Sequence, residues 1–321
     1  MSSKPSAAFL DFATLGPGVD TSRLDEVVAA RYFDFSEEDE IRARLQGCEV
    51  ALLNKTRLDR RLIEQAKGLR LIVVAATGLD NVDAVAAGEA GVAVANVRDY
   101  CPDAVAQHVF ALVLGLTQQI GPYAGRVREG AWSRSKSFAL FDFPIRELNG
   151  RKLGIVGYGS LGGAVARIGE AFGMQVLVSE RVGCDAPGAE DRVPFEEVLE
   201  EADVLSLHCP LNDGTRCMLD AAAFRRMKRD AIVINTARGG LIDQEALADA
   251  LRDGEIGGAG VDVLPEEPPA ADAPLLAADI PNLIVTPHIA WAAREARQRV
   301  VDQVAENVAS FYAGGELRRI V

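Results

Sequence analysis

Three polar side chains, Arg238, Glu267 and His288, each follow the end of a different strand-like apolar run in the second half of the chain. An arginine binds a carboxylate through a planar fork, a histidine moves a proton near neutral pH, and a glutamate orients and charges an imidazole. Parallel strands end at one edge of a sheet, so residues far apart in sequence meet there. Each residue alone also fits a surface charge or an ordinary loop position. Together they indicate a site for hydride transfer.

A glycine-rich turn precedes these residues in the chain. Gly157, Gly159 and Gly162 have G-x-G-x-x-G spacing, after a short apolar run and before apolar residues that recur with a helical period. This spacing permits a tight turn, a close approach of backbone to a pyrophosphate, and close packing of helix on strand. The next strand, 174–179, ends at Glu180, whose carboxylate is placed to accept from ribose hydroxyls. The alternative is a purely structural strand-helix-strand unit, and the context favours a dinucleotide site.

Length and charge limit the classes of function. The chain has 321 residues, enough for two domains, and 34 basic against 47 acidic residues give a net charge of −13. Such a charge repels nucleic acid and anionic membranes, so neither is expected as a partner. An anionic cofactor or substrate remains compatible, because helix ends and single arginines act locally.

Cysteine content and the N-terminal segment indicate a reducing compartment. The cysteines are odd in number and show no C-x-x-C pair, so we expect neither disulfides nor a metal site but reduced thiols in the core. They are Cys48, Cys101, Cys184, Cys209 and Cys217. The apolar run 7–10 is too short for a signal peptide or a membrane span. We therefore expect a cytoplasmic protein.

Residues 7–97 predict a first α/β domain with a parallel sheet. Strand-like runs at 8–12, 48–53, 71–75 and 92–97 alternate with helical runs at 22–30, 59–66 and 82–87. After the run 71–75, Thr77 and Gly78 could present backbone N–H groups to a substrate carboxylate. The alternative is an ordinary strand-to-helix loop capped by Asp80.

The middle of the chain predicts a long helix and then an irregular segment. Residues 102–117 have a helical apolar period that begins at Pro102, and His108 within it reads as a packed histidine rather than a ligand. Residues 118–149 mix basic and aromatic side chains without a period, which suggests an arm that packs against a partner subunit. Beyond the glycine turn, further strands alternate with helical runs such as 195–202 and 244–253, which predicts a second doubly wound sheet.

These motifs resemble those of the D-isomer-specific 2-hydroxyacid dehydrogenase family. The resemblance runs from about residue 50 to the C-terminus. The matching stretches are 76–81 (Ala-Thr-Gly-Leu-Asp-Asn), 156–162 (Val-Gly-Tyr-Gly-Ser-Leu-Gly), 235–243 (Asn-Thr-Ala-Arg-Gly-Gly-Leu-Ile-Asp), 258–263 (Gly-Ala-Gly-Val-Asp-Val), Glu267-Pro268 and 286–290 (Thr-Pro-His-Ile-Ala). Residues 139–143, 179–181 and Trp291 look most like the glycerate dehydrogenase, or hydroxypyruvate reductase, branch.

The resemblance implies an architecture of two doubly wound parallel-sheet domains. A flavodoxin-like substrate domain would comprise 1–98 and 290–321, and a Rossmann NAD-binding domain would comprise 99–289. Residues 118–149 would be the dimerisation arm of a homodimer. The final helical run, 292–311, and the helix at 102–117 would connect the domains.

The resemblance also implies residue roles. Arg238 would bind substrate, Glu267 would pair with His288, and His288 would be the acid/base, while backbone at Thr77 and Gly78 would meet the substrate carboxylate. Asp262 would hold the nicotinamide carboxamide. The cofactor site as a whole is assigned to Gly157, Tyr158, Gly159, Ser160, Leu161, Gly162, Glu180, Arg181, His208, Cys209, Pro210, Thr215, Thr236, Ala237 and Asp262.

Cofactor choice and reaction follow from the same comparison. Many relatives carry aspartate where Glu180 stands, and Arg181 follows it here, so NAD is favoured while NADP remains an alternative. We expect reduction of a small 2-keto acid to a D-2-hydroxy acid, of the hydroxypyruvate or glyoxylate type. The second hypothesis is a dinucleotide-sensing, corepressor-like protein, because some relatives of this fold act in that way.

Overall fold

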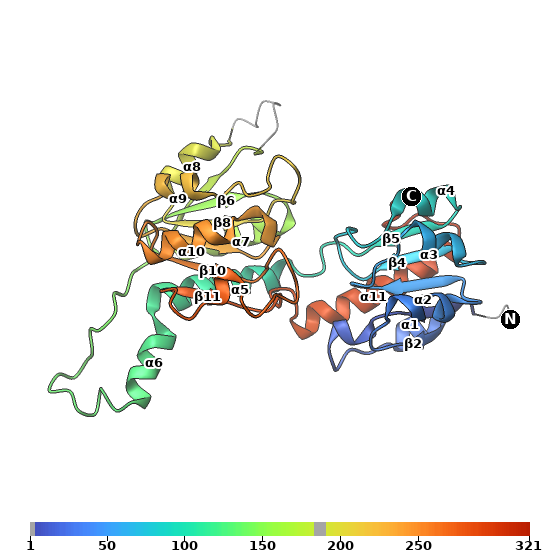
Figure 1. Ribbon diagram of the computed structural model, residues 1–321, viewed down its shortest axis with the longest axis horizontal. Helices are drawn as coiled ribbons and strands as arrows, with labels where there is room; N and C mark the ends of the chain where they lie inside the picture. The colour runs from blue at the N-terminus through green and yellow to red at the C-terminus, as the bar shows by residue number, and fades with distance from the viewer. Residues whose placement is uncertain (1–3, 183–190) are drawn as a thin grey trace. The chain divides into compact units, whose positions relative to one another are not determined.

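The computed structural model of the protein describes residues 4–182 and 191–321 and contains two compact α/β units (Figure 1). Both ends of the chain, Met1–Tyr100 and Ala292–Val321, form unit 1, and Cys101–Trp291 forms unit 2. Cys184 lies outside the described residues. The chain therefore enters unit 2 once and leaves it once.

Unit 1 is built on a five-stranded sheet in which every neighbouring pair is parallel. Its order β2-β1-β3-β4-β5 is flavodoxin-like. The strands are β1 (Ser6–Phe9), β2 (Ala29–Tyr32), β3 (Val50–Leu53), β4 (Leu71–Val74) and β5 (Ala93–Asn96). Each position of β3, β4 and β5 is buried, because helices cover both faces of the sheet. This double burial explains why these strands are continuous apolar runs in the sequence.

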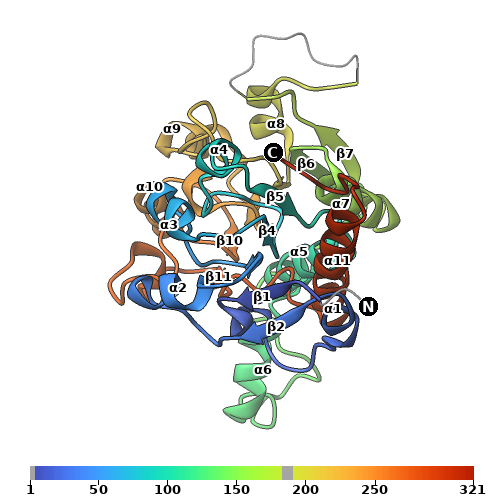
Figure 2. The same ribbon diagram turned by 90° about the vertical axis from the view of Figure 1, so that its right-hand side faces the viewer.

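Helices from both ends of the chain cover this sheet. They are α1 (Ser22–Val27), α2 (Glu38–Leu45), α3 (Arg60–Gln65), α4 (Ala84–Glu89) and α11 (Arg294–Tyr312). In Figure 2, α1 and α11 lie on one face of the sheet and α2, α3 and α4 on the other. The buried side of α11 includes Val300, Val304 and Val308. The C-terminal helix thus completes the core of the N-terminal sheet.

One expectation for this unit was wrong, and one helix was not predicted. Residues 22–30 do not form one helix, because α1 ends at Val27 and Ala29–Tyr32 forms the edge strand β2. Helix α2 was not predicted, because it is mostly charged and buries only Ile41 and Leu45. An edge strand and a helix with so little buried surface leave no apolar run in the sequence.

Unit 2 is built on a six-stranded parallel sheet with the order β11-β10-β9-β8-β6-β7. The strands are β6 (Lys152–Val156), β7 (Gln175–Val178), β8 (Val204–Leu207), β9 (Ile232–Asn235), β10 (Gly258–Val261) and β11 (Leu283–Val285). The chain passes from β6 to β7 on one side and returns to β8 on the other. Such a switch point is where open α/β sheets bind ligands. The expected pair of doubly wound parallel sheets is confirmed.

The helices of unit 2 include the expected long helix. They are α5 (Pro102–Gln118), α6 (Ile120–Arg128), α7 (Ser160–Ala171), α8 (Phe195–Glu201), α9 (Ala221–Arg226) and α10 (Gln244–Arg252). The segment 118–149 is not wholly irregular, because it contains α6. In Figure 1, α6 and the chain that follows it extend away from the sheet of unit 2. Two aromatic side chains of this segment, Phe138 and Phe141, are 88% and 81% exposed.

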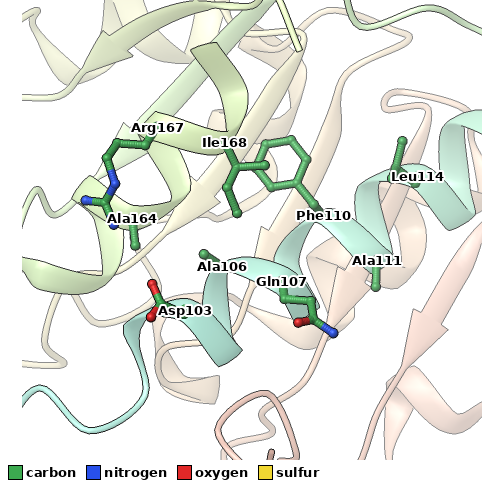
Figure 3. Close-up of a pocket in the computed structure, with 9 residues that line it drawn as sticks. All are labelled: Asp103, Ala106, Gln107, Phe110, Ala111, Leu114, Ala164, Arg167 and Ile168. Atoms are coloured by element: carbon green, nitrogen blue, oxygen red, sulfur yellow. The ribbon is translucent and has the colours of Figure 1, made fainter. Parts of the chain in front are cut away.

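A groove of about 590 Å³ lies between α5 and α7 (Figure 3). Its lining comprises Asp103, Ala106, Gln107, Phe110, Ala111, Leu114, Ala164, Arg167 and Ile168. Phe110 and Ile168 give it apolar walls, and Asp103 and Arg167 lie at one end (Figure 3). None of the sequence-assigned site residues lines this groove, so it is a separate surface feature.

The cysteines are only partly core residues. Among the described residues no cysteine forms a disulfide; Cys48 and Cys101 are buried, Cys209 is half-buried and Cys217 is exposed. The expectation of core thiols is therefore wrong for Cys217. Among the described residues, no helix is both long and apolar enough to cross a bilayer.

Candidate active site

The glycine turn joins β6 to α7, and two of its glycines are required by the packing of the chain itself. Gly157 has φ +97°, and a Cβ there would lie 2.5 Å from the backbone N of Cys209. A Cβ on Gly162 would lie 2.2 Å from the carbonyl oxygen of Gly157. At Gly159, by contrast, a Cβ would meet nothing within 4 Å. The chain therefore leaves open space at the glycine that a pyrophosphate would approach.

The N-terminus of α7 is suited to an anion. Gly159 is its N-cap and offers no side chain, and the first turn contains no acidic residue. The backbone N–H groups at Ser160 and Leu161 stand at the positive end of the helix dipole. A dinucleotide phosphate therefore fits this end of the helix.

The adenosine end of the proposed cofactor site lies after β7. Glu180 is exposed, while the preceding Ser179 is buried. The N–H of Glu180 donates to the carbonyl of Val193 at 2.8 Å, and the N–H of Val193 donates to Val178 at 2.9 Å. These bonds fix the backbone of Glu180, so its carboxylate is presented from a rigid position.

The loop after β8 carries His208, Cys209 and Pro210 and packs against the Gly157 turn. The Nε2 of His208 lies 2.9 Å from the hydroxyl of Ser206. Desolvation lowers the pKa of His208 to about 4 and raises the pKa of the Cys209 thiol to about 11. Both groups are therefore neutral near pH 7. The Nδ1 of His208 is buried and has no hydrogen-bond partner among the described residues, as expected of a polar atom that faces a ligand site.

Thr215 and Thr236, both assigned to the cofactor site, differ in their surroundings. The hydroxyl of Thr215 donates to Pro210 at 2.8 Å and so folds its own loop. The hydroxyl of Thr236 is buried and has no partner within the part of the chain that is described. Thr236 therefore has an unused polar atom beside Arg238, while Thr215 acts on the loop that carries His208.

Arg238 lies at the carboxyl end of β9 in a turn fixed by Asn235. The buried Asn235 amide donates to the carbonyl of Arg238 at 2.9 Å and accepts from the N–H of Ala237 at 3.1 Å. Next to it, a Cβ on Gly239 would lie 2.0 Å from the carbonyl carbon of Leu264. The Arg238 turn thus packs against the start of the loop that carries Glu267.

Glu267 and His288 form a direct pair. The Nδ1 of His288 lies 2.5 Å from Oε2 of Glu267, and the other carboxylate oxygen accepts from the N–H of Leu264 at 3.0 Å. A carboxylate only accepts, so Nδ1 carries the proton in this contact. The Nε2 of His288 is left for proton transfer, and the side chain is 29% exposed. The arrangement provides an oriented acid/base.

A buried carboxylate, Asp262, fixes the loop that carries His288. Its two oxygens accept from the N–H groups of Ile289 and Ala290, at 2.9 and 2.8 Å, and from the Thr286 hydroxyl at 2.5 Å. His288 itself adopts φ +55°, which is uncommon for a residue with a side chain. Asp262 therefore contacts this loop, and its side chain is fully buried. Its expected contact with a carboxamide stays a prediction.

His108 belongs to the same network. Its Nε2 lies 3.0 Å from the hydroxyl of Thr286, which already donates to Asp262. The Thr286 oxygen is then the acceptor, so His108 carries a proton on Nε2. Long helix α5 is thereby joined to the loop of His288. The expectation of a packed histidine holds, with a polar contact that spacing could not reveal.

The sequence-assigned residues divide between the two units. Arg238, Glu267 and His288 lie at the carboxyl ends of β9, β10 and β11, which are neighbours in one sheet. Thr77 and Gly78 belong to unit 1 and follow β4.

Local hydrogen bonds fix the Thr77 loop, and the cap of the helix that follows is not the expected Asp80. The Thr77 hydroxyl donates to Val97 at 3.1 Å, and the Asn96 amide donates to the Thr77 carbonyl at 2.8 Å. Asp80 does not cap the next helix, because the carboxylate of Asp83 accepts from the N–H of Ala86 at 2.8 Å.

Residues that position the site were missed in the sequence. Asn235, Ser206 and Thr286 each hold a neighbour in place through a buried side chain or a loop hydroxyl. Each lies three or fewer residues from an assigned site residue, and this proximity was the signal in the sequence that could have identified it. Across the described ranges, no group of three or more His, Cys, Asp or Glu side chains is arranged to hold a metal ion.

A glycine turn at the switch point of a doubly wound sheet, with arginine, glutamate and histidine at the ends of its neighbouring strands, defines a dinucleotide-dependent dehydrogenase. Comparison with known proteins gives the family. Residues 110–290 match the family described as D-isomer specific 2-hydroxyacid dehydrogenase, NAD binding domain. The chain therefore belongs to the D-isomer-specific 2-hydroxyacid dehydrogenase family, and its cofactor is NAD(H).

Individual relatives cover nearly the whole chain. A glycerate dehydrogenase of Methylorubrum extorquens is 46% identical over 306 residues, which is 92% of this chain and 95% of the relative. A hydroxypyruvate reductase of Blautia hydrogenotrophica is 35% identical over 311 residues, 95% of this chain and 96% of the relative. The crystal structure of the TT0316 protein from Thermus thermophilus superimposes with a TM-score of 0.86 at 33% identity, covering 98% of this chain and 100% of that one. The chain is thus an NAD-dependent D-2-hydroxyacid dehydrogenase that acts on a CH–OH group, and the corepressor hypothesis is not favoured.

Proposed function

We propose that this enzyme reduces a small 2-keto acid of the hydroxypyruvate or glyoxylate type with NADH, and oxidises the corresponding D-2-hydroxy acid. The observation that carries the proposal is the 2.5 Å pair of His288 Nδ1 and Glu267 Oε2. These residues follow β11 and β10, and Arg238 follows β9, the next strand of the same sheet. The names of the two relatives, glycerate dehydrogenase and hydroxypyruvate reductase, support this substrate class.

Each of the three site residues has a distinct role in the reaction. Arg238 binds the substrate carboxylate and its keto oxygen through its planar guanidinium. His288 gives the proton on Nε2 to the oxygen of the keto group as charge develops there, and takes it back in the oxidation. Glu267 holds the ring through Nδ1 and stabilises the positively charged imidazole, so it is a positioning residue. Nicotinamide, when bound, supplies or accepts the hydride.

The two domains of the chain have different binding roles. Residues 99–289 bind the cofactor, with the pyrophosphate at the glycine turn and the ribose at Glu180. Residues 1–98 and 290–321 form the substrate domain, where backbone N–H groups at Thr77 and Gly78 receive the substrate carboxylate. Support for this placement is their position directly after β4, at the carboxyl edge of the sheet of unit 1.

The enzyme acts in the cytoplasm as a homodimer joined through the arm, residues 118–149. Support for the dimer is the exposure of Phe138 and Phe141 on a segment that extends from unit 2, with an open apolar groove between α5 and α7 elsewhere on the unit (Figure 3). Sedimentation of the intact chain should give twice the 34.3 kDa of one chain, and a single-chain mass would contradict the dimer.

A panel of 2-keto acids tests the substrate class. Steady-state oxidation of NADH should be fastest, by kcat/KM, with hydroxypyruvate or glyoxylate, slower with pyruvate and slowest with bulkier keto acids. The product from hydroxypyruvate should be D-glycerate. Preference for a bulky keto acid would contradict the proposed substrate, and the absence of NADH oxidation with every member would contradict the reaction itself.

A further inference from the structure

Arg192 links the two elements that mark the adenosine end of the cofactor site. Its Nη1 donates to the carbonyl of Ser179 at 3.3 Å, and Ser179 directly precedes Glu180. Its guanidinium carbon lies 5.3 Å from the centroid of the Tyr158 ring, within the glycine turn. A single cation therefore contacts both the end of β7 and the turn that begins α7.

The backbone around Arg192 is fixed as firmly as that of Glu180. Val193 forms a parallel bridge with Ser179, receives the N–H of Glu180 at 2.8 Å and donates to Val178 at 2.9 Å. The contact with the Tyr158 ring holds the guanidinium by a cation–π interaction. The side chain is thus positioned beside the glycine turn rather than extended into solvent.

The position of the Arg192 guanidinium determines which part of a bound dinucleotide it can contact. In a dinucleotide site the carboxylate after the second strand binds the ribose hydroxyls and the glycine turn binds the pyrophosphate, so the 2′ position lies beside that carboxylate. A guanidinium has five N–H donors, of which the bond to Ser179 uses one. Within residues 4–182 and 191–321 the side chain makes the two contacts described and no ion pair. Among the described residues, therefore, no carboxylate neutralises its charge.

We propose that Arg192 is a cofactor-specificity residue that binds the 2′-phosphate of NADP(H), so that the enzyme accepts NADP(H) as well as NAD(H) despite the carboxylate of Glu180. Arginine matches phosphate geometry with paired hydrogen bonds, and its charge offsets the repulsion between Glu180 and the phosphate. Arg181 adjoins Glu180 in the sequence and is exposed, whereas Arg192 comes from a different segment and is held in place. The inference rests on the placement of the ribose at Glu180 in the proposed function.

Binding of two small nucleotides by calorimetry tests the proposal without turnover. The probes are 5′-AMP, which lacks the 2′-phosphate, and 2′,5′-ADP, which carries it. The wild type should bind 2′,5′-ADP with a Kd within about tenfold of that for 5′-AMP. Arg192→Gln should weaken 2′,5′-ADP by about tenfold or more, as expected for a lost charged hydrogen bond, and change 5′-AMP by less than about threefold. Arg225→Gln, which removes an exposed arginine on α9, is the control for net charge and should change neither.

Each other outcome overturns the proposal in a recognisable way. Equal weakening of both nucleotides by Arg192→Gln would show that the residue only supports the glycine turn. An unchanged Kd for 2′,5′-ADP would remove Arg192 from recognition. Failure of the wild type to bind 2′,5′-ADP while it binds 5′-AMP would exclude NADP(H). Failure to bind either nucleotide would also contradict the adenosine site at Glu180, and so separates an error in the proposed function from an error at Arg192.

Discussion

Replacing His288 with asparagine should lower kcat by about 10³-fold or more in both directions, because proton transfer by a positioned side chain contributes typically 10²- to 10⁴-fold. The asparagine amide N–H can still donate a hydrogen bond to Glu267, which lies 2.5 Å from Nδ1 in the wild type, but the amide cannot exchange a proton. The Kd for NADH should change by less than about threefold, since the glycine turn and Glu180 are untouched. Steady-state kinetics with NADH titration would measure both quantities.

His108→Asn is the matched control, because it makes the same chemical change on α5. His108 contacts Thr286 rather than the reacting atoms, so this variant should lose at most about tenfold in kcat. A His288→Asn enzyme that keeps kcat within about tenfold of the wild type would show that another group supplies the proton.

The second large effect is expected at Arg238. Arg238→Lys should lower kcat/KM for the keto acid by about 10²- to 10³-fold, because lysine offers a point charge where the guanidinium forms two parallel bonds. The turn should survive, because the variant keeps the Asn235 bonds to the backbone of residues 237 and 238, although it loses the bond from Arg238 Nη1 to the Ala237 carbonyl. Cofactor binding should be little changed, and kcat/KM would be measured alongside the Kd for NADH.

Arg225→Lys on the outside of α9 provides the control for an arginine-to-lysine change in the same unit and should behave as the wild type. An Arg238→Lys enzyme with unimpaired kcat/KM would remove Arg238 from substrate binding. Loss of NADH binding in the same variant would instead indicate a disturbed turn.

The sequence predicts the buried parts of the fold well, for a physical reason. Strands such as β4 (Leu71–Val74) and β9 (Ile232–Asn235) are covered on both faces, so burial requires an unbroken apolar run. The edge strand β2, with alternate exposure, and the charged helix α2 carry no comparable requirement. Their place is set by pairing with β1 and packing against α3, which depend on the folded sheet.

In the candidate site, too, some features could be predicted from the sequence and others depend on the folded structure. Arg238, Glu267 and His288 could be predicted because parallel strands end at one edge, and the pair of Glu267 and His288 has the geometry that this prediction requires. The Asp262 network and the contact of Arg192 with Tyr158 could not be predicted, because they join segments that meet only after folding. Likewise, the sequence suggested Asp80 as the cap of this loop, and the N-cap of α4 is Asp83, because the cap is set by the turn geometry.

The most direct test of the central claim is a single-turnover reduction of hydroxypyruvate by enzyme-bound NADH, followed by NADH fluorescence, in the wild type and in Glu267→Gln. Glutamine keeps the size of Glu267 but removes the negative charge that stabilises the proton-donating imidazolium. With the pair at 2.5 Å, the variant should be slower by about 100-fold, within the range for acid/base catalysis, while the Kd for NADH stays unchanged. A Glu267→Gln enzyme that completes the single turnover at the wild-type rate would contradict the account.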